Sequence, residues 1–156
     1  MTVVLKAGDA APDFDMAADG GGRVALADFK GKAVVLYFYP KDDTTGCTTE
    51  AKGFAEAADD FAAAGVAVVG VSKDSVASHN RFKAKYGLNF ALGSDADGAV
   101  VEAYGVWVEK SMYGRQYMGI ERATFLIDAK SEIVRVWRKV KVAGHVAEVL
   151  AAARAL

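Results

Sequence analysis

The stretch Tyr39-Pro-Lys-Asp-Asp-Thr-Thr-Gly-Cys-Thr-Thr-Glu50 joins two segments of different character. Residues 33–39, which lead into it, are an unbroken apolar run rich in valine and aromatic side chains, as is typical of a buried strand. Pro40 ends that strand, because proline has no N–H to donate to a neighbouring strand. From Thr48 onward, apolar residues recur every three or four positions as far as Gly65, which predicts a helix. The stretch is therefore a strand-to-helix connection, a basic unit of α/β folds.

Cys47 is the only cysteine of the chain, and this pattern places it in the first turn of the helix. The amide groups of a first turn lack partners within the helix, and the helix dipole adds positive charge there. Both effects favour a thiolate over a thiol. Thr44, three residues earlier, is predicted to cap the helix and to bring its hydroxyl near the sulfur. A lone cysteine is more often a small buried apolar residue, but the threonines and glycine around Cys47 favour a reactive site.

The other segments alternate between strand and helix patterns. Residues 106–117 show no clean period and are interpreted as a loop with at most one extended piece. A strand over residues 66–71 is expected to run parallel to the first one. The remaining predicted strands are 13–17 and 23–25, which form an N-terminal hairpin, 88–92, and 124–127 with 133–137, which form a second hairpin. The remaining predicted helices are 75–86, 99–104 and 142–156. This order predicts a single α/β domain over residues 1–156, built as a layered sandwich.

Composition limits the function classes. The 156 residues are 53% hydrophobic and 25% charged, as in a globular domain, and suffice for one sizeable core. The formal net charge of −1 gives no sign of a nucleic-acid partner. Apolar runs are too short for a membrane helix, and residues 1–6 do not resemble a secretion signal. A single cysteine suits a reducing compartment, so a cytoplasmic location is expected.

The motif Pro40-x-x-x-Thr44-x-x-Cys47 resembles the active site of the peroxiredoxins. Similarity to one subfamily, the bacterioferritin comigratory protein or PrxQ, extends over nearly the whole chain. The segments that carry it are Gly8–Phe14, Lys85–Phe90, Ser94–Gly98, Ala103–Trp107 and Gly119–Asp128. This resemblance implies a thioredoxin-like fold, a three-layer sandwich in which helices flank a central mixed sheet and a β-hairpin stands at the N-terminus.

The resemblance also implies an activity. Peroxiredoxins are oxidoreductases, and the expected reaction is thiol-dependent reduction of hydrogen peroxide and organic hydroperoxides through a sulfenic acid on Cys47. The implied catalytic residues are Cys47, Thr44, Arg122 and Pro40. Arg122 is expected beside the sulfur, a role that suits its permanent charge and fixed fork of donors, although by itself it would be interpreted as a surface arginine. Pro40 is expected to cover the sulfur, and Thr44 to bond the substrate oxygen.

Several roles stay open at this stage. Glu50, three residues after Cys47, either orients Arg122 or is an exposed first-turn glutamate. Phe38, Phe90 and Trp107 either wall the pocket or belong to the core. His79 and His145 lack metal-type spacing, so neither a metal nor a cofactor is expected.

The chain departs from the commonest subfamily pattern because it has no resolving cysteine. Relatives carry one either at the position of Lys52 or in the helix that corresponds to Ser75–Tyr86. The resemblance therefore implies resolution by an external thiol of thioredoxin, glutaredoxin or small-molecule type, by a monomer or weak homodimer. Two alternatives are a disulfide reductase, which normally needs a cysteine where Thr44 stands, and a non-catalytic binding module, holdase or peroxide sensor on the same fold.

Overall fold

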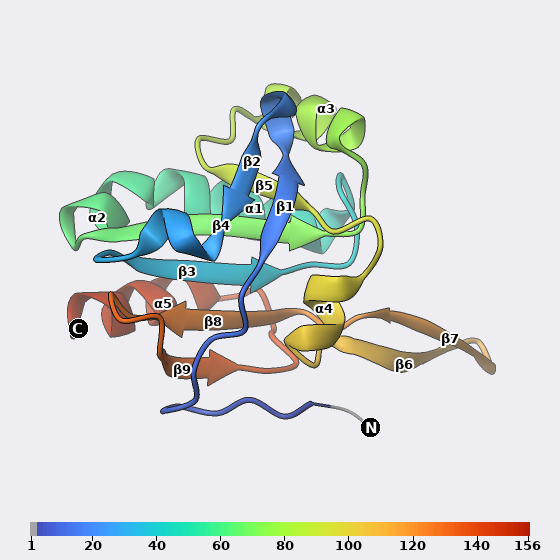
Figure 1. Ribbon diagram of the computed structural model, residues 1–156. Helices are drawn as coiled ribbons and strands as arrows, with labels where there is room; N and C mark the ends of the chain where they lie inside the picture. Colours follow the sequence, from blue (N-terminus) through green and yellow to red (C-terminus); the bar gives the residue numbers. More distant parts are fainter. Residues whose placement is uncertain (1–2) are drawn as a thin grey trace.

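One mixed sheet of seven strands forms the centre of the computed structural model, which describes residues 3–156 (Figure 1). Residues 1–2 of the predicted domain and N-terminal segment lie outside the described part. In spatial order the strands are β2 (Arg23–Ala25), β1 (Asp15–Ala18), β5 (Ala91–Ser94), β4 (Val66–Ser72), β3 (Ala33–Phe38), β8 (Ala123–Ile127) and β9 (Ile133–Trp137). Strand β3 pairs in parallel with β4, as predicted, and antiparallel with β8. The predicted strand-to-helix connection thus starts from the middle of the sheet.

Helices cover both faces of this sheet, so the expected three-layer sandwich is confirmed (Figure 1). Four helices lie on one face: α1 (Thr45–Glu56), α2 (Ala58–Ala63), α3 (Val76–Tyr86) and α5 (His145–Arg154). The other face is covered by α4 (Ala99–Ala103) and by the β1–β2 hairpin, which curls over it. Helix α3 packs against the β1–β5 side of the sheet. Short 3₁₀ turns, Asp19–Gly21 and Leu26–Phe29, lie at the two ends of β2.

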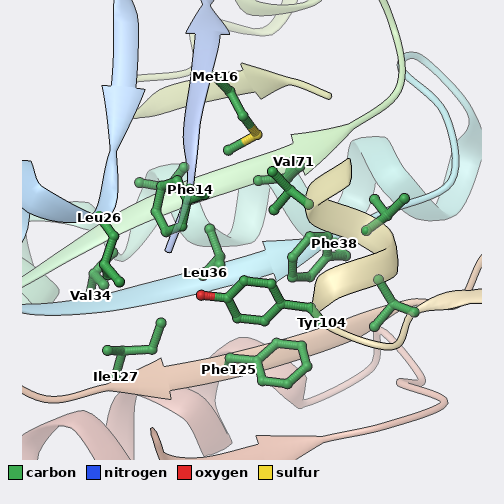
Figure 2. Packing of buried hydrophobic residues seen from close by; sticks show 14 of the residues in the cluster. Phe14, Met16, Leu26, Val34, Leu36, Phe38, Val71, Tyr104, Phe125 and Ile127 are labelled. Atoms are coloured by element: carbon green, nitrogen blue, oxygen red, sulfur yellow. The ribbon is translucent and has the colours of Figure 1, made fainter. Parts of the chain in front are cut away.

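Strand β3 shows why an uninterrupted apolar run was needed. Its side chains alternate between the two faces, as in any strand. Leu36 and Phe38 point into the cluster drawn in Figure 2, together with Tyr104, which directly follows α4. Val35 and Tyr37 point into the opposite cluster, under α1. Because both faces are covered, every residue of β3 is buried.

Most element boundaries agree with the predictions within a few residues. The helix predicted from Thr48 begins at Thr45 and is divided at Ala57 into α1 and α2. The helix predicted over 142–156 begins only at His145. The strand predicted over 88–92 is instead Ala91–Ser94, because the N–H of Leu88 still bonds the Lys83 carbonyl and closes α3.

The loop predicted over residues 106–117 is wrong. It is a β-hairpin of β6 (Trp107–Met112) and β7 (Arg115–Ile120), which projects from the body of the molecule (Figure 1). Its side chains are mostly exposed, so one face carries no apolar alternation to reveal a strand. The available signal was the turn Tyr113-Gly114, where both residues have positive φ as in the tight turns of hairpins.

Within residues 3–156, each helix is too short or too polar to cross a lipid bilayer.

Candidate active site

Cys47 lies in the first turn of α1, as predicted, directly after the loop that leaves β3. The N–H of Thr48 donates to the carbonyl of Thr44 and closes this turn. The side chain of Cys47 is only 1% exposed, and it belongs to the apolar cluster between α1 and the sheet. The sulfur is therefore held at a helix N-terminus and largely shielded from solvent.

Arg122, which is 75 positions after Cys47 in the sequence, lies beside this sulfur. Its Nη2 donates to Cys47 Sγ at 3.3 Å, while its Nη1 donates to Glu50 Oε1 at 2.7 Å. The register of the sheet explains why Arg122 and Cys47 are close, because Phe38, the last residue of β3, pairs with Ala123, the first residue of β8. The residue before β8 therefore stands beside the loop after β3. One guanidinium bridges two residues of α1 that are three positions apart.

The guanidinium of Arg122 stays positively charged in this buried site. Burial by itself would lower the pKa of Arg122, but the charges of Glu50 and Cys47 raise it above its ordinary value. The Arg122 side chain is 16% exposed, so its attraction for the sulfur is little screened by water. A thiolate at Cys47 thus faces a cation on one side and the helix N-terminus on the other.

Glu50 is completely buried, so the alternative of an exposed first-turn glutamate is wrong. Its Oε1 binds Arg122, whereas its Oε2 has no hydrogen-bond partner among residues 3–156. Burial raises the pKa of Glu50 to about 7, although Arg122 opposes the rise. The carboxyl group is therefore in position to orient the guanidinium, and its own protonation changes near neutral pH.

Gly46 is a site residue that the sequence marked only as a neighbour of Cys47. A Cβ added there would lie 3.1 Å from Arg122 Nη2, closer than side chains normally pack. The absence of a side chain lets the guanidinium approach the first turn of α1. The available signal was the glycine itself, since glycine is a poor helix residue that needs a reason inside a helix.

Thr44 and Pro40 lie in the exposed loop between β3 and α1. Thr44 occupies the N-cap position with an extended backbone, but its side chain makes no capping bond, so that part of the prediction is wrong. Its hydroxyl instead donates to the carbonyl of Lys41 at 2.9 Å. This bond uses the hydroxyl proton locally and leaves the oxygen free to accept.

Of the three aromatic candidates, Phe38 and Trp107 pack in or against the core cluster on the face opposite Cys47. Phe90 shares the cluster of Cys47 and meets Tyr37 edge to face. Both histidines are buried, and residues 3–156 contain no group of three side chains suited to hold a metal ion.

Comparisons with known proteins agree with this geometry. The AhpC/TSA family matches residues 7–136. A putative peroxiredoxin bcp of Coxiella burnetii is 55% identical over 146 residues, which cover 94% of this chain and 97% of the relative. Among solved structures, a mutant of Xylella fastidiosa PrxQ superposes with a TM-score of 0.93 at 41% identity and covers 98% of both chains. The bacterioferritin comigratory protein of Xanthomonas campestris gives 0.88 at 45% identity over 94% of this chain and 98% of that one.

The family match and the superposed folds point to the same class of protein. The non-catalytic alternative is not favoured, since relatives 47–55% identical are named as peroxiredoxins. The chain therefore belongs to the AhpC/TSA family and is a peroxiredoxin of the Bcp/PrxQ type, a thiol peroxidase.

Proposed function

We propose that Cys47 is the peroxidatic residue and that Arg122 is its electrostatic partner. The observation that carries the proposal is the 3.3 Å hydrogen bond from Arg122 Nη2 to Cys47 Sγ at a helix N-terminus. The remaining donors of the guanidinium are free to hold a peroxide beside the sulfur. Glu50 fixes the plane of the guanidinium through Nη1.

In the first step the thiolate attacks the terminal oxygen of the peroxide. The new S–O bond forms as the O–O bond breaks, and the bonding pair leaves on the other oxygen as alkoxide or hydroxide. Cys47 becomes a sulfenic acid, and the leaving oxygen takes up a proton to give alcohol or water. Negative charge builds on the leaving oxygen, so the guanidinium of Arg122 lowers the barrier by meeting that charge as it forms.

The loop residues complete the site in this proposal. The hydroxyl of Thr44, whose proton is donated to Lys41, accepts a hydrogen bond from the terminal O–H of the peroxide. Pro40 shields the reacting atoms from water, a task for which a residue without an N–H is suited. The bacterioferritin comigratory protein of Xanthomonas campestris is described by its alkyl peroxide reduction activity, which supports organic hydroperoxides beside hydrogen peroxide as substrates here.

The second step needs a thiol from outside the chain, because Cys47 is the only cysteine. An external thiolate attacks the sulfenic sulfur, the S–O bond breaks, and a mixed disulfide forms; the oxygen leaves as hydroxide, which takes up a proton from solvent to give water. A second thiol then releases Cys47 as a thiol. Cys47 is only 1% exposed, so the first turn of α1 has to open before a protein reductant can reach its sulfur. A monomer or weak homodimer in a reducing cytoplasm, supplied by a thioredoxin, a glutaredoxin or a small thiol, fits this cycle.

Mass spectrometry of Cys47 after one equivalent of peroxide tests the proposal. Dimedone, which traps sulfenic acids, should label Cys47 in the wild type, and excess peroxide should drive it to sulfinic acid and inactivate the enzyme. The Cys47→Ser variant should consume no peroxide, which also separates this proposal from a peroxide-binding module without turnover. A quantitative disulfide-linked dimer with no trapped sulfenate would show that a second copy, and not an external thiol, resolves Cys47.

A further inference from the structure

Asp42 is a buried carboxylate in the loop that also carries Pro40 and Thr44. It is 8% exposed, although its neighbours on both sides are exposed. Its Oδ1 accepts from the hydroxyl of Tyr39, and its Oδ2 accepts from Ser78 Oγ at 2.8 Å. The same Oδ2 lies 2.7 Å from His79 Nδ1. Because Ser78 and His79 belong to α3, this one side chain ties the loop to that helix.

Both ring nitrogens of His79 face acceptors. Nδ1 meets the Asp42 carboxylate, and Nε2 lies 2.9 Å from the backbone carbonyl of Gly93 in β5. A carbonyl oxygen has no proton to give, so Nε2 must carry one. The Asp42 carboxylate already accepts from two hydroxyls, which favours its ionised form, so Nδ1 must donate as well. The geometry is that of an imidazolium, held at 0% exposure between β5 and the loop.

The groups around the ring support this charge. Burial alone would lower the pKa of His79, but the hydrogen bond and charge of Asp42, the Gly93 carbonyl and the charge of Asp74 raise it above its ordinary value. Tyr39 is the other titratable group facing the ring, with its hydroxyl 3.5 Å from Nδ1. Asp74 also bonds the loop directly, since its Oδ2 accepts from the Asp42 N–H at 2.9 Å.

We propose that His79 is a positioning residue for the peroxidase reaction. As a buried cation it binds the Asp42 carboxylate and thereby holds the Pro40–Thr44 loop in its reactive conformation. This inference rests on the function proposed above for Cys47. The other links between α3 and the loop carry less: the hydrogen bond from Ser78 to Asp42 comes from a neutral hydroxyl. The contacts of Lys85 and Tyr86 with Asp43 are exposed and therefore contribute little. In a buried pair, by contrast, loss of one partner leaves the other charge unpaired, so the loop depends on His79.

Single-turnover kinetics with peroxide isolate the step that the loop serves. His79→Gln, which keeps hydrogen-bonding capacity but not the charge, and Asp42→Asn should each slow Cys47 oxidation on the order of ten- to hundredfold, as for a misplaced reacting group. The double variant should be no slower than the worse single variant, because both changes break the same link. Lys85→Gln, which removes the exposed ion pair between the same helix and loop, is the matched control and should stay within about twofold.

A purely structural role would lower the unfolding temperature but leave this rate unchanged in variants that circular dichroism shows to be folded. That result for His79→Gln would overturn the proposal. If instead the role proposed for Cys47 were wrong, the Cys47→Ser variant would retain peroxide consumption, which distinguishes that outcome from a failure of the His79 proposal.

Wild-type protein gives a second test that needs no stable variant. Nitrogen-15 correlation spectra should show protons on both ring nitrogens of His79 at pH 7. His145, whose pKa burial lowers to about 4, is the internal reference for a neutral ring. Because the folded pKa of His79 is raised, its contribution is full below the ordinary value of 6.5 and is lost as pH rises through the folded value. The oxidation rate should fall over the same pH range in which His79 loses its proton. A neutral His79 at pH 7 would contradict the proposal, and so would an oxidation rate that stays constant over the pH range in which His79 loses its proton.

Discussion

Arg122 meets Cys47 and Glu50 through two different nitrogens of one planar group. A lysine would keep the positive charge, but it is a point charge that cannot hold two partners in a fixed plane. We therefore expect Arg122→Lys to reduce kcat/KM for peroxide on the order of 10²–10³-fold, as for loss of one preorganised donor. Stopped-flow kinetics measure the change, and Arg115→Lys in the exposed part of β7 is the control. A lysine variant as fast as the wild type would remove Arg122 from the chemistry.

Ionisation of the buried Glu50 lowers the free energy of unfolding, so the stability of the protein depends on pH. Its folded pKa of about 7 lies above its ordinary value of 4.5 because the carboxyl group is buried. A raised folded pKa means that its contribution to stability is full below pH 4.5 and is lost as pH rises through 7. At about 1.4 kcal/mol per pKa unit, the loss amounts to a few kcal/mol.

Glu50→Gln should abolish this loss while its amide oxygen still accepts from Arg122. The variant should therefore gain stability relative to the wild type between pH 4.5 and 8, as measured by urea unfolding at both values. Glu56→Gln, at an exposed position of the same helix, is the control and should show no such trend. An equal free-energy difference at both pH values would mean that Glu50 is ionised throughout.

At the scale of the element, the first turns of α1 decide how Cys47 can be resolved. Lys52 stands five residues after Cys47 on the same helix. Five residues advance about 7.5 Å along a helix and turn about 140° around it, so the two side chains point apart. A disulfide between these positions requires Cα atoms within about 7 Å and suitable directions, which an intact α1 does not provide.

Lys52→Cys should nevertheless form an internal disulfide after one equivalent of peroxide, together with a loss of helical signal from the unwound turns. Intact-mass analysis reports the bond, and far-ultraviolet circular dichroism reports the unwinding. Dimedone labelling should fall in this variant and stay at the wild-type level in Lys52→Ser. Persistent dimedone labelling in Lys52→Cys would show that α1 does not open under these conditions.

At the scale of the whole molecule, we expect residues 1–156 to unfold as one domain. Both core clusters share strand β3, which contributes Leu36 to one and Tyr37 to the other, so neither can be lost alone. At about 0.7 kcal/mol per residue near 60 °C, the calorimetric enthalpy should be about 110 kcal/mol and should equal the van't Hoff enthalpy. Two resolved transitions, or a van't Hoff enthalpy well below the calorimetric one, would contradict a single cooperative unit.

The sequence by itself determined the parts of the structure that depend on neighbours along the chain. The run into β3, its end before Pro40 and the placement of Cys47 in the first turn of a helix follow from local periodicity and backbone chemistry. The cap at Ser75, whose hydroxyl accepts from the Ser78 N–H, is of the same local kind. The resemblance to the peroxiredoxins supplied Arg122, which its own neighbours would have marked as an ordinary surface residue.

Only the tertiary structure decided which distant residues meet. The antiparallel register of β3 and β8 brings Arg122 to Cys47, and no pattern within one turn of helix or one strand encodes that register. The burial of Glu50 and the close approach at Gly46 follow from the same meeting. His79 lacked any local sign of function, because its partners Asp42 and Gly93 come from segments that only the folded sheet places together. Contacts of this kind depend on the packing of the whole sheet, whereas local sequence patterns extend over a few residues.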